Sequence, residues 1–258
     1  MECRLPSGAP LNLTTRKSEV LLAYLALAPG IPHLRDRLIN LLWSDRGEDQ
    51  ARNSLRQSLS SIKKAFETEI PGLLEIERTI VKLSAGQIQV DVREFEQLAA
   101  EETLEALSQA AEHYQGEFLE GITIRDAACE DWLDNERGRF KRQLIEVLSK
   151  LSQALIDSKE FDHAIETAER LVDQDPLVED GWRLLMRAYF DKGSRNHALK
   201  AYRRCRDALS LELGVEPETA TTELREMMAS GKLTSPRPAR PTMPAYPEPS
   251  DDNGAIDH

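Results

Sequence analysis

The segment QARNSLRQSLSSIKKAF, residues 50–66, has the pattern of an amphipathic α-helix. Its apolar residues recur every three or four positions, which brings them onto one face of a helix. They are Ala51, Leu55, Leu59, Ile62 and Phe66. The remaining positions are mostly polar or basic, and residues 51–66 contain no acidic residue. We therefore expect a helix that packs one face on a core and exposes cationic side chains on the other.

Two shorter helices are expected before this segment. The first covers residues 16–27, where an apolar stripe follows a threonine N-cap at residues 14–15 and Pro29-Gly30 ends the helix. The second runs from about Leu34 to Trp43. The polar residues 44–49 then form a loop that leads into the third helix.

Strands are expected after the third helix and at the start of the chain. Residues 74–76 and 80–83 alternate like two short strands around the turn Glu77-Arg78-Thr79. A further β segment is expected at residues 88–90, and two short strands between Arg4 and Leu13. Three helices followed by a hairpin predict a winged helix.

The chain is expected to be mainly α-helical and to contain three regions. Residues 1–91 form the winged-helix domain, with its three helices and β-hairpin. Residues 92–230 have helical periodicity throughout and form an all-α TPR-like domain. Residues 231–258 contain six prolines and no aliphatic pattern, so this tail is expected to be disordered.

An internal repeat supports the TPR-like interpretation. An offset of 34 residues aligns Ala164 with Ala198 and Leu151 with Leu185. A small residue at the helix crossing allows two antiparallel helices to approach closely. We also expect the Asp175-Pro176 pair to start a helix, and Gly214 to follow a helix C-terminus.

The helix at residues 50–66 is the candidate DNA-reading element, because the major groove admits one α-helix and Arg or Asn side chains can bond base edges there. The candidates for base contacts are Asn53, Arg56, Gln57 and Ser60, and those for phosphate contacts are Arg52, Lys63 and Lys64. Taken alone, such a face is more often merely solvated. Its place after two short helices and before a hairpin favours DNA binding.

Weaker candidates lie outside this helix. Arg78 at the hairpin tip and Lys82 on the second strand could contact a minor groove or phosphate, although a lone exposed arginine on a turn is common. Arg16 and Lys17 at a helix N-terminus could also touch phosphate. The loop at residues 44–50 could face RNA polymerase, but a plain solvated connection is slightly favoured.

An enzyme has no positive support in the sequence. The histidines show no metal-ligand spacing, and there is no Gly-rich phosphate loop, GxSxG or CxxC motif. We expect no catalytic residues, no metal and no cofactor. Four aromatic residues could be imagined as a ligand cage but are more often core at helical spacing; they are Trp132, Trp182, Tyr189 and Tyr202.

The charge is unevenly distributed. The net charge is −12, yet residues 1–92 carry a net +1 and the remainder −13. An acidic body joined to a locally basic helix can bind DNA in one orientation, because phosphate repels the body. Three dispersed cysteines, no long apolar run and no signal peptide predict a reduced, cytoplasmic protein with no membrane partner.

Several strings resemble known regulators. RKSEVLLAYLAL, LINLLWSD and QARNSLRQSLSSIKKAF are similar to the winged-helix part of the Streptomyces antibiotic regulatory protein (SARP) family. HYQGEFLEGI, EDWLDNERGRF, DQDPLVEDGWRLLMRAY and LSLELGVEPE resemble its bacterial transcriptional activator domain (BTAD). The match extends over about residues 4–228. Family members usually have another β-strand before the segment where this chain begins, so we expect a short N-terminal sheet.

The resemblance implies an activator that binds double-stranded promoter DNA, often as a dimer on direct repeats, and recruits RNA polymerase. It also implies that the TPR-like domain adds protein–protein contacts. The alternative is a TPR-type scaffold that binds another protein and whose DNA-binding domain is inert. The salt dependence of binding separates the two, because neutralising phosphates makes DNA affinity fall steeply with salt.

Overall fold

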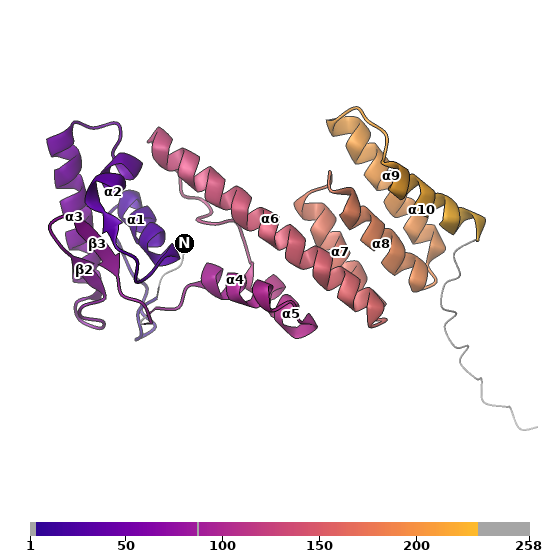
Figure 1. Ribbon diagram of the computed structural model, residues 1–258, viewed down its shortest axis with the longest axis horizontal. Coiled ribbons are helices and arrows are strands. Elements are labelled where there is room, and N and C mark those ends of the chain that lie inside the picture. The colour runs from indigo at the N-terminus through magenta and orange to yellow at the C-terminus, as the bar shows by residue number, and fades with distance from the viewer. Residues whose placement is uncertain (1–3, 87, 232–258) are drawn as a thin grey trace, which may run out of the picture.

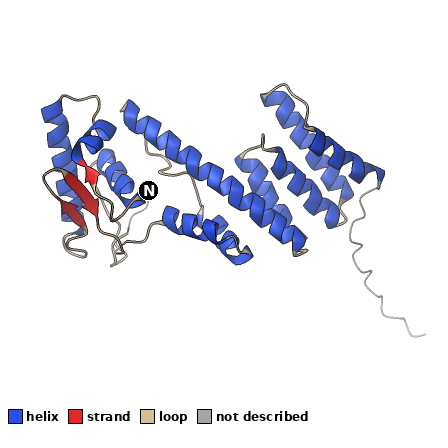
Figure 2. Ribbon diagram, in the orientation of Figure 1, coloured by secondary structure: helices blue, strands red, loops and turns tan. Residues whose placement is uncertain are grey.

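The computed structural model describes residues 4–86 and 88–231, which form a small winged helix followed by a helical domain (Figures 1 and 2). The predicted fold class, mainly α with a winged helix first and paired helices after it, is confirmed. All but the first residue of the predicted tail, 231–258, lies outside the described residues.

The winged helix contains the expected three helices and hairpin. Its elements are α1 (Arg16–Leu27), β1 (His33–Leu34), α2 (Arg35–Leu42), α3 (Glu48–Phe66), β2 (Leu74–Ile76) and β3 (Ile80–Leu83). Thr15 caps α1, since its hydroxyl accepts a hydrogen bond from the Ser18 amide at 3.1 Å. The third helix begins at Glu48, two residues earlier than predicted, because acidic side chains in a first turn stabilise a helix N-terminus.

The predicted strand at residues 88–90 is wrong. The sheet has the antiparallel order β1-β3-β2, with Leu74 opposite Leu83 and His33 opposite Val81. Both edges of β3 are therefore occupied, and the third strand of the sheet is β1, whose residues were expected in a loop and at the start of a helix. Residues 88–90 instead lead into the next helix, for which Val90 is the N-cap.

The two strands expected between Arg4 and Leu13 are not formed in the described structure, which has one isolated bridge there, between Arg4 and Pro10. A tight turn brings these residues together, with the Gly8 amide bonded to the Leu5 carbonyl at 2.8 Å. Proline has no amide hydrogen to continue a ladder. The pairing therefore stops at Pro10, and residues 11–13 are not a strand in the described structure.

The helical domain consists of α4 (Asp91–Glu101), α5 (Leu104–His113), α6 (Ala127–Asp157), α7 (Phe161–Gln174), α8 (Glu179–Asp191), α9 (Arg195–Glu212) and α10 (Thr219–Ser230). The long α6 crosses the centre of the molecule, from the winged helix to the α7–α10 stack (Figure 1). It begins five residues before the predicted start at Trp132. Cys129, fully buried in its first turn, extends the apolar face toward the N-terminus.

The predicted repeat corresponds to two helix pairs. The C-terminal part of α6 packs on α7, and α8 packs on α9. Ala164 and Ala198 are both fully buried at these crossings. Gly214 follows α9 in a left-handed conformation with φ +68°, as expected after a helix end.

The prediction that Asp175-Pro176 starts a helix is wrong. Asp175 ends α7, and its carboxylate accepts a hydrogen bond from the Leu177 amide at 3.1 Å in the following turn. The next helix begins only at Glu179. The Pro176 carbonyl instead accepts a hydrogen bond from the Trp182 indole N–H at 2.8 Å, which anchors the turn on α8.

Within the described residues there are two clusters of buried apolar side chains, and the larger crosses the predicted domain boundary. It runs from Val20 in α1 through α6 to Ala188 in α8. The smaller cluster surrounds Trp182 at the far end of the molecule. Because one core includes side chains from the winged helix and from α6, the two parts are packed on each other.

Candidate nucleic-acid interface

The predicted apolar face of α3 is buried as expected. Its apolar positions, Ala51, Leu55, Leu59, Ile62 and Phe66, are each at most 6% exposed. This face packs on α1, α2 and β2. The other face therefore points away from the core, and Lys63 and Lys64 in the last turn are favourable at the negative end of the helix dipole.

All seven predicted DNA-contact residues of α3 are exposed on this outer face. They are Arg52, Asn53, Arg56, Gln57, Ser60, Lys63 and Lys64. Arg52 pairs with Glu48 one turn earlier. The Arg56 guanidinium donates to the Asn53 amide oxygen at 3.3 Å. Two of the predicted base-contact residues are thus already side by side.

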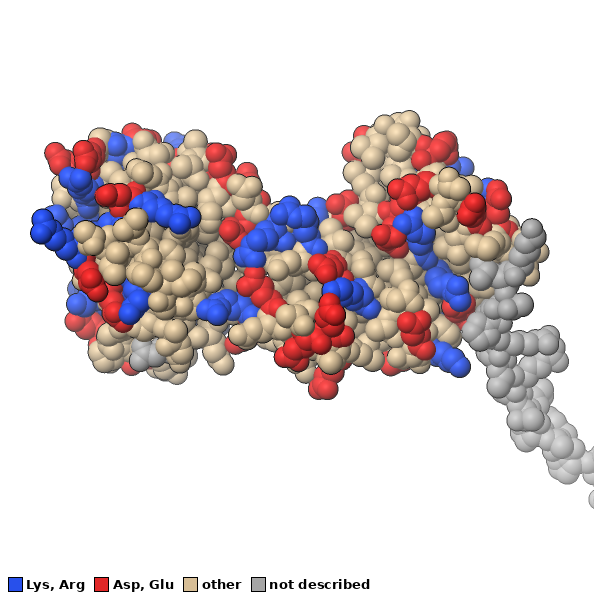
Figure 3. All heavy atoms as spheres, in the orientation of Figure 1, with Lys and Arg blue, Asp and Glu red and all other residues tan. Residues whose placement is uncertain are grey.

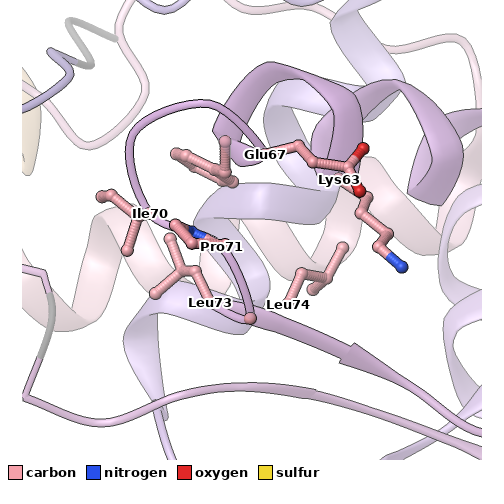
Figure 4. A pocket seen from close by; sticks show the side chains of 8 residues that line it. Lys63, Glu67, Ile70, Pro71, Leu73 and Leu74 are labelled. Atoms are coloured by element: carbon pink, nitrogen blue, oxygen red, sulfur yellow. The ribbon is translucent and has the colours of Figure 1, made fainter.

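Lys63 and Lys64 lie in the last turn of α3, and both side chains are exposed. Among the described residues, neither Lys63 nor Lys64 forms an ion pair. Figure 4 shows a pocket beside Lys63, lined mainly by apolar residues such as Ile70, Pro71 and Leu73. We assign no ligand to this gap between α3 and the hairpin, because its only charged lining residues are Lys63 and Glu67 at the rim.

The β2–β3 hairpin, which is the wing of the winged helix, is held by α2. Of its two predicted DNA-contact residues, Lys82 forms an ion pair and Arg78 forms none with the described residues. Arg78 lies exposed at the tip of the β2–β3 turn. The Arg35 amide donates to the Thr79 carbonyl at 2.9 Å, which fixes the tip. Lys82 lies opposite Glu75 and pairs with it at 2.8 Å. The hydrogen bond from Lys82 lowers the pKa of Glu75, and the carboxylate offsets the charge that Lys82 could offer to DNA.

The two cations predicted at the start of α1 have different surroundings. Arg16 is exposed, and the hydroxyls of Thr14 and Ser61 lie 3.2 Å apart, which places the start of α1 beside the second half of α3. Lys17 instead points into the molecule. Its ammonium lies 3.5 Å from Asp126 and its side chain is only 18% exposed. The structure therefore does not place Lys17 with the other predicted contacts.

Asp126, which precedes α6, was not among the predicted site residues. Its side chain is fully buried, and its carboxylate accepts hydrogen bonds from the Ser44 amide at 3.0 Å and the Ser44 hydroxyl at 2.9 Å. Burial alone would raise the pKa of Asp126, but the bonds from Ser44 and the charge of Lys17 outweigh it and hold the pKa below the ordinary value. An aspartate before a helix resembles an ordinary N-cap, so its long-range partners left no sequence signal.

The aromatic residues considered as a ligand cage are structural, as favoured. Trp182 is 3% exposed in the smaller core. Trp132 lies between Tyr24 of α1 and Phe118, with ring centroids 5.3 and 5.9 Å away. Tyr189 and Tyr202 are half-buried against the Trp182 cluster.

Charged side chains of both signs lie over both parts of the molecule. In Figure 3, Lys and Arg side chains project at the edge formed by α3 beside Asp and Glu side chains, and further Asp and Glu side chains gather over α4 and α5. No helix in the described part of the chain is long and apolar enough to cross a membrane. Residues 4–86 and 88–231 also contain no group of three His, Cys, Asp or Glu side chains that could hold a metal ion.

Comparison with known proteins gives a consistent set of relatives. The family model of the bacterial transcriptional activator domain matches residues 88–228. The chain is 29% identical over 227 residues to the transcriptional regulatory protein MoaR1 of Mycobacterium tuberculosis, covering 81% of this chain and 71% of that protein. It is 26% identical over 231 residues to the regulatory protein AfsR of Streptomyces coelicolor, covering 85% of this chain and 22% of AfsR.

A solved structure supports the fold. The structure of Mycobacterium tuberculosis EmbR in complex with a low-affinity phosphopeptide is similar, with a TM-score of 0.70. The similarity covers 87% of this chain and 62% of that chain, at 22% sequence identity. EmbR is named a transcriptional regulatory protein.

Proposed function

We propose that the chain, which belongs to the family defined by the bacterial transcriptional activator domain, binds promoter DNA through α3. Members of this family are transcriptional regulators rather than enzymes. Recruitment of RNA polymerase, and so activation, is the second part of the proposal. The family resemblance supports this second part.

The observation that carries the proposal is the outer face of α3. A helix exposed along one side fits the major groove, where arginine and asparagine side chains can each form two hydrogen bonds with a base edge. Arg56 and Asn53 are adjacent in the first half of the helix, the part that usually contacts bases. Lys63 and Lys64, about two to three turns further along α3, suit phosphates.

Neighbouring elements extend this surface. Arg78 at the wing tip and Arg16 at the start of α1 are both exposed, and both elements flank α3. Phosphate contacts from such residues set the position of a protein on DNA without reading sequence. The acidic helical domain is repelled by phosphate, so the protein is expected to dock with α3 foremost.

The experiment is a fluorescence-anisotropy titration of the full chain with DNA from upstream of its own and neighbouring genes, at two salt concentrations. Arg56→Ala and Asn53→Ala should weaken binding to the preferred sequence by about 5- to 150-fold, the range for a lost base contact, and reduce discrimination between sequences. Lys64→Ala should weaken binding to all sequences similarly and lower the salt slope by about one.

Lys200→Ala is the matched control, because Lys200 is an exposed lysine on α9. It should bind as the unchanged protein does. If Arg56→Ala and Lys64→Ala also bind as the unchanged protein does, α3 is not the DNA-reading helix. If no DNA binds at micromolar protein and low salt, the alternative of a TPR-type protein-binding scaffold replaces this proposal.

A further inference from the structure

One buried carboxylate joins the helical domain to the winged helix. Asp126 lies in the segment between α5 and α6, and its side chain is fully buried. It accepts two hydrogen bonds from Ser44, and the ammonium of Lys17 lies 3.5 Å from it. Both partners belong to the winged helix, 82 and 109 residues away in sequence.

Through Ser44, this contact reaches the turn that leads into α3. Ser44 follows Trp43, the C-cap of α2, and opens the four-residue turn 44–47 that leads directly into α3. The second half of the same turn is tied to α3 itself, since the Arg46 guanidinium donates to the Ser54 hydroxyl at 2.9 Å. Ser54 is the neighbour of Asn53. Hydrogen bonds therefore link the helical domain, the turn and the first half of α3.

The segment that carries Asp126 is itself held in place. Arg137 of α6 donates to the carbonyls of Phe118, Leu119 and Ile122 at 3.1 to 3.2 Å. These bonds fold the segment before Asp126 onto α6. The carboxylate is thus presented to Ser44 from a fixed support.

We propose that Asp126 is a positioning residue for the DNA-binding surface, which holds the turn before α3 through Ser44 and so fixes the first half of α3 for contact with DNA. This inference rests on the proposed role of α3. A buried charge is expensive unless it is paired and hydrogen-bonded, and here the pairing spans the junction. A turn already ordered in the free protein has less conformational entropy to lose when DNA binds.

Packing at the junction makes the proposal testable by substitution. The edge-on contact between Tyr24 and Trp132 and the shared core hold α1 against α6 independently of Asp126. Asp126→Ala is therefore expected to fold with the two parts still packed, while the turn loses its acceptor. Asp126→Asn keeps an oxygen acceptor for Ser44 and loses the charge that attracts Lys17.

The test has one measurement without DNA and one with it. Hydrogen–deuterium exchange of the free full chain should show about tenfold faster exchange of the amides in residues 44–54 in Asp126→Ala, with a smaller change in Asp126→Asn. DNA affinity should fall about 3- to 10-fold in Asp126→Ala with an unchanged salt slope, because no phosphate contact is removed. A residue that contacted phosphate would change the slope.

Leu209→Ala is the control for a general loss of stability, because Leu209 is 3% exposed in the core around Trp182, away from the junction. It should leave DNA affinity unchanged and should not speed exchange in residues 44–54 more than in the rest of the winged helix. Exchange in Asp126→Ala equal to that of the unchanged protein would overturn the inference, as would normal DNA affinity despite faster exchange. Exchange is measured without DNA, so it tests the role of Asp126 alone. The proposed role of α3 is tested separately, and it fails if Arg56→Ala binds DNA as the unchanged protein does.

Discussion

Trp132 of α6 meets Tyr24 of α1 edge-on, with ring centroids 5.3 Å apart and ring planes at 62°. Tyr24 makes a similar contact with His33 of β1, and Trp132 with Phe118. These rings form a continuous aromatic contact from the small sheet of the winged helix to the helical domain. Together with the shared core, this contact predicts that the two parts unfold as one unit.

Trp132→Ala should lower the free energy of unfolding by about 2–4 kcal/mol, since it removes a large ring that packs on both parts. The control is Tyr24→Phe, which retains the ring and should change the free energy by less than about 1 kcal/mol. Differential scanning calorimetry of the unchanged protein should show a single transition. Two well-separated transitions would contradict the idea of a shared core.

The helices were predictable from the sequence because their apolar residues repeat with the helical period. The boundaries of α1 and the hairpin follow from local patterns, and so does the presence of two helix pairs, but α6 and α8 begin at Ala127 and Glu179 rather than at the predicted residues. The third strand was not predictable, because β1 is only two residues long, His33 and Leu34, and exists through pairing with β3. Short strands of this kind depend on distant partners rather than on their own pattern.

Asp126 predicts a specific acid dependence of stability. Its pKa in the folded protein lies below the ordinary value of 3.8. Its ionised form therefore stabilises the fold above that pH, and this contribution is lost as the pH falls through the lower folded value. Lys17 and, through it, Asp45 are the charged groups that share this site.

Urea denaturation should show Asp126→Asn less stable by about 2 kcal/mol between pH 5 and pH 8, the scale of hydrogen bonds to a charged group. The difference should shrink below about pH 4. A difference that stays constant down to pH 3 would show that the charge of Asp126 does not contribute.

The two described cysteines should be unreactive in the native protein. Burial raises the pKa of Cys129 to about 11 and that of Cys205 to about 12, so almost no thiolate is present at pH 8. Alkylation with iodoacetamide at pH 8, followed by peptide mass spectrometry, should label neither residue within a time that labels both completely in urea. Rapid native labelling of Cys205 would show that α9 opens locally.

The exposed face of α3 was predictable because the spacing of the apolar residues within the helix determines which side chains are buried and which are exposed. Whether Lys17 and Lys82 form ion pairs was not predictable, because this depends on carboxylates that the fold brings next to them. Lys17 forms an ion pair with Asp126, 109 residues later, and Lys82 forms one with Glu75 on the neighbouring strand. A cation near a predicted DNA surface is available to phosphate only where no such partner faces it.

Two glycines in helices should respond in opposite directions to the same substitution. A β-carbon on Gly138 of α6 would meet only the guanidinium end of Arg142, at 3.3 Å, which can move aside. Gly138→Ala should therefore raise the free energy of unfolding by about 0.5–1 kcal/mol, the usual gain in helix propensity.

A β-carbon on Gly181 of α8 would lie 3.0 Å from two atoms of the Leu171 side chain and 3.2 Å from Val172. Both neighbours are buried on α7, Leu171 completely and Val172 to 2% exposure, so neither can yield without disturbing the core. Gly181→Ala should lower the free energy of unfolding by about 1–3 kcal/mol despite the better helix propensity of alanine. Thermal denaturation of both variants, followed by circular dichroism, tests the pair. Stabilisation by both substitutions would mean that α7 and α8 are not packed as closely as the structure shows, whereas opposite signs would locate the tight helix crossing at Gly181.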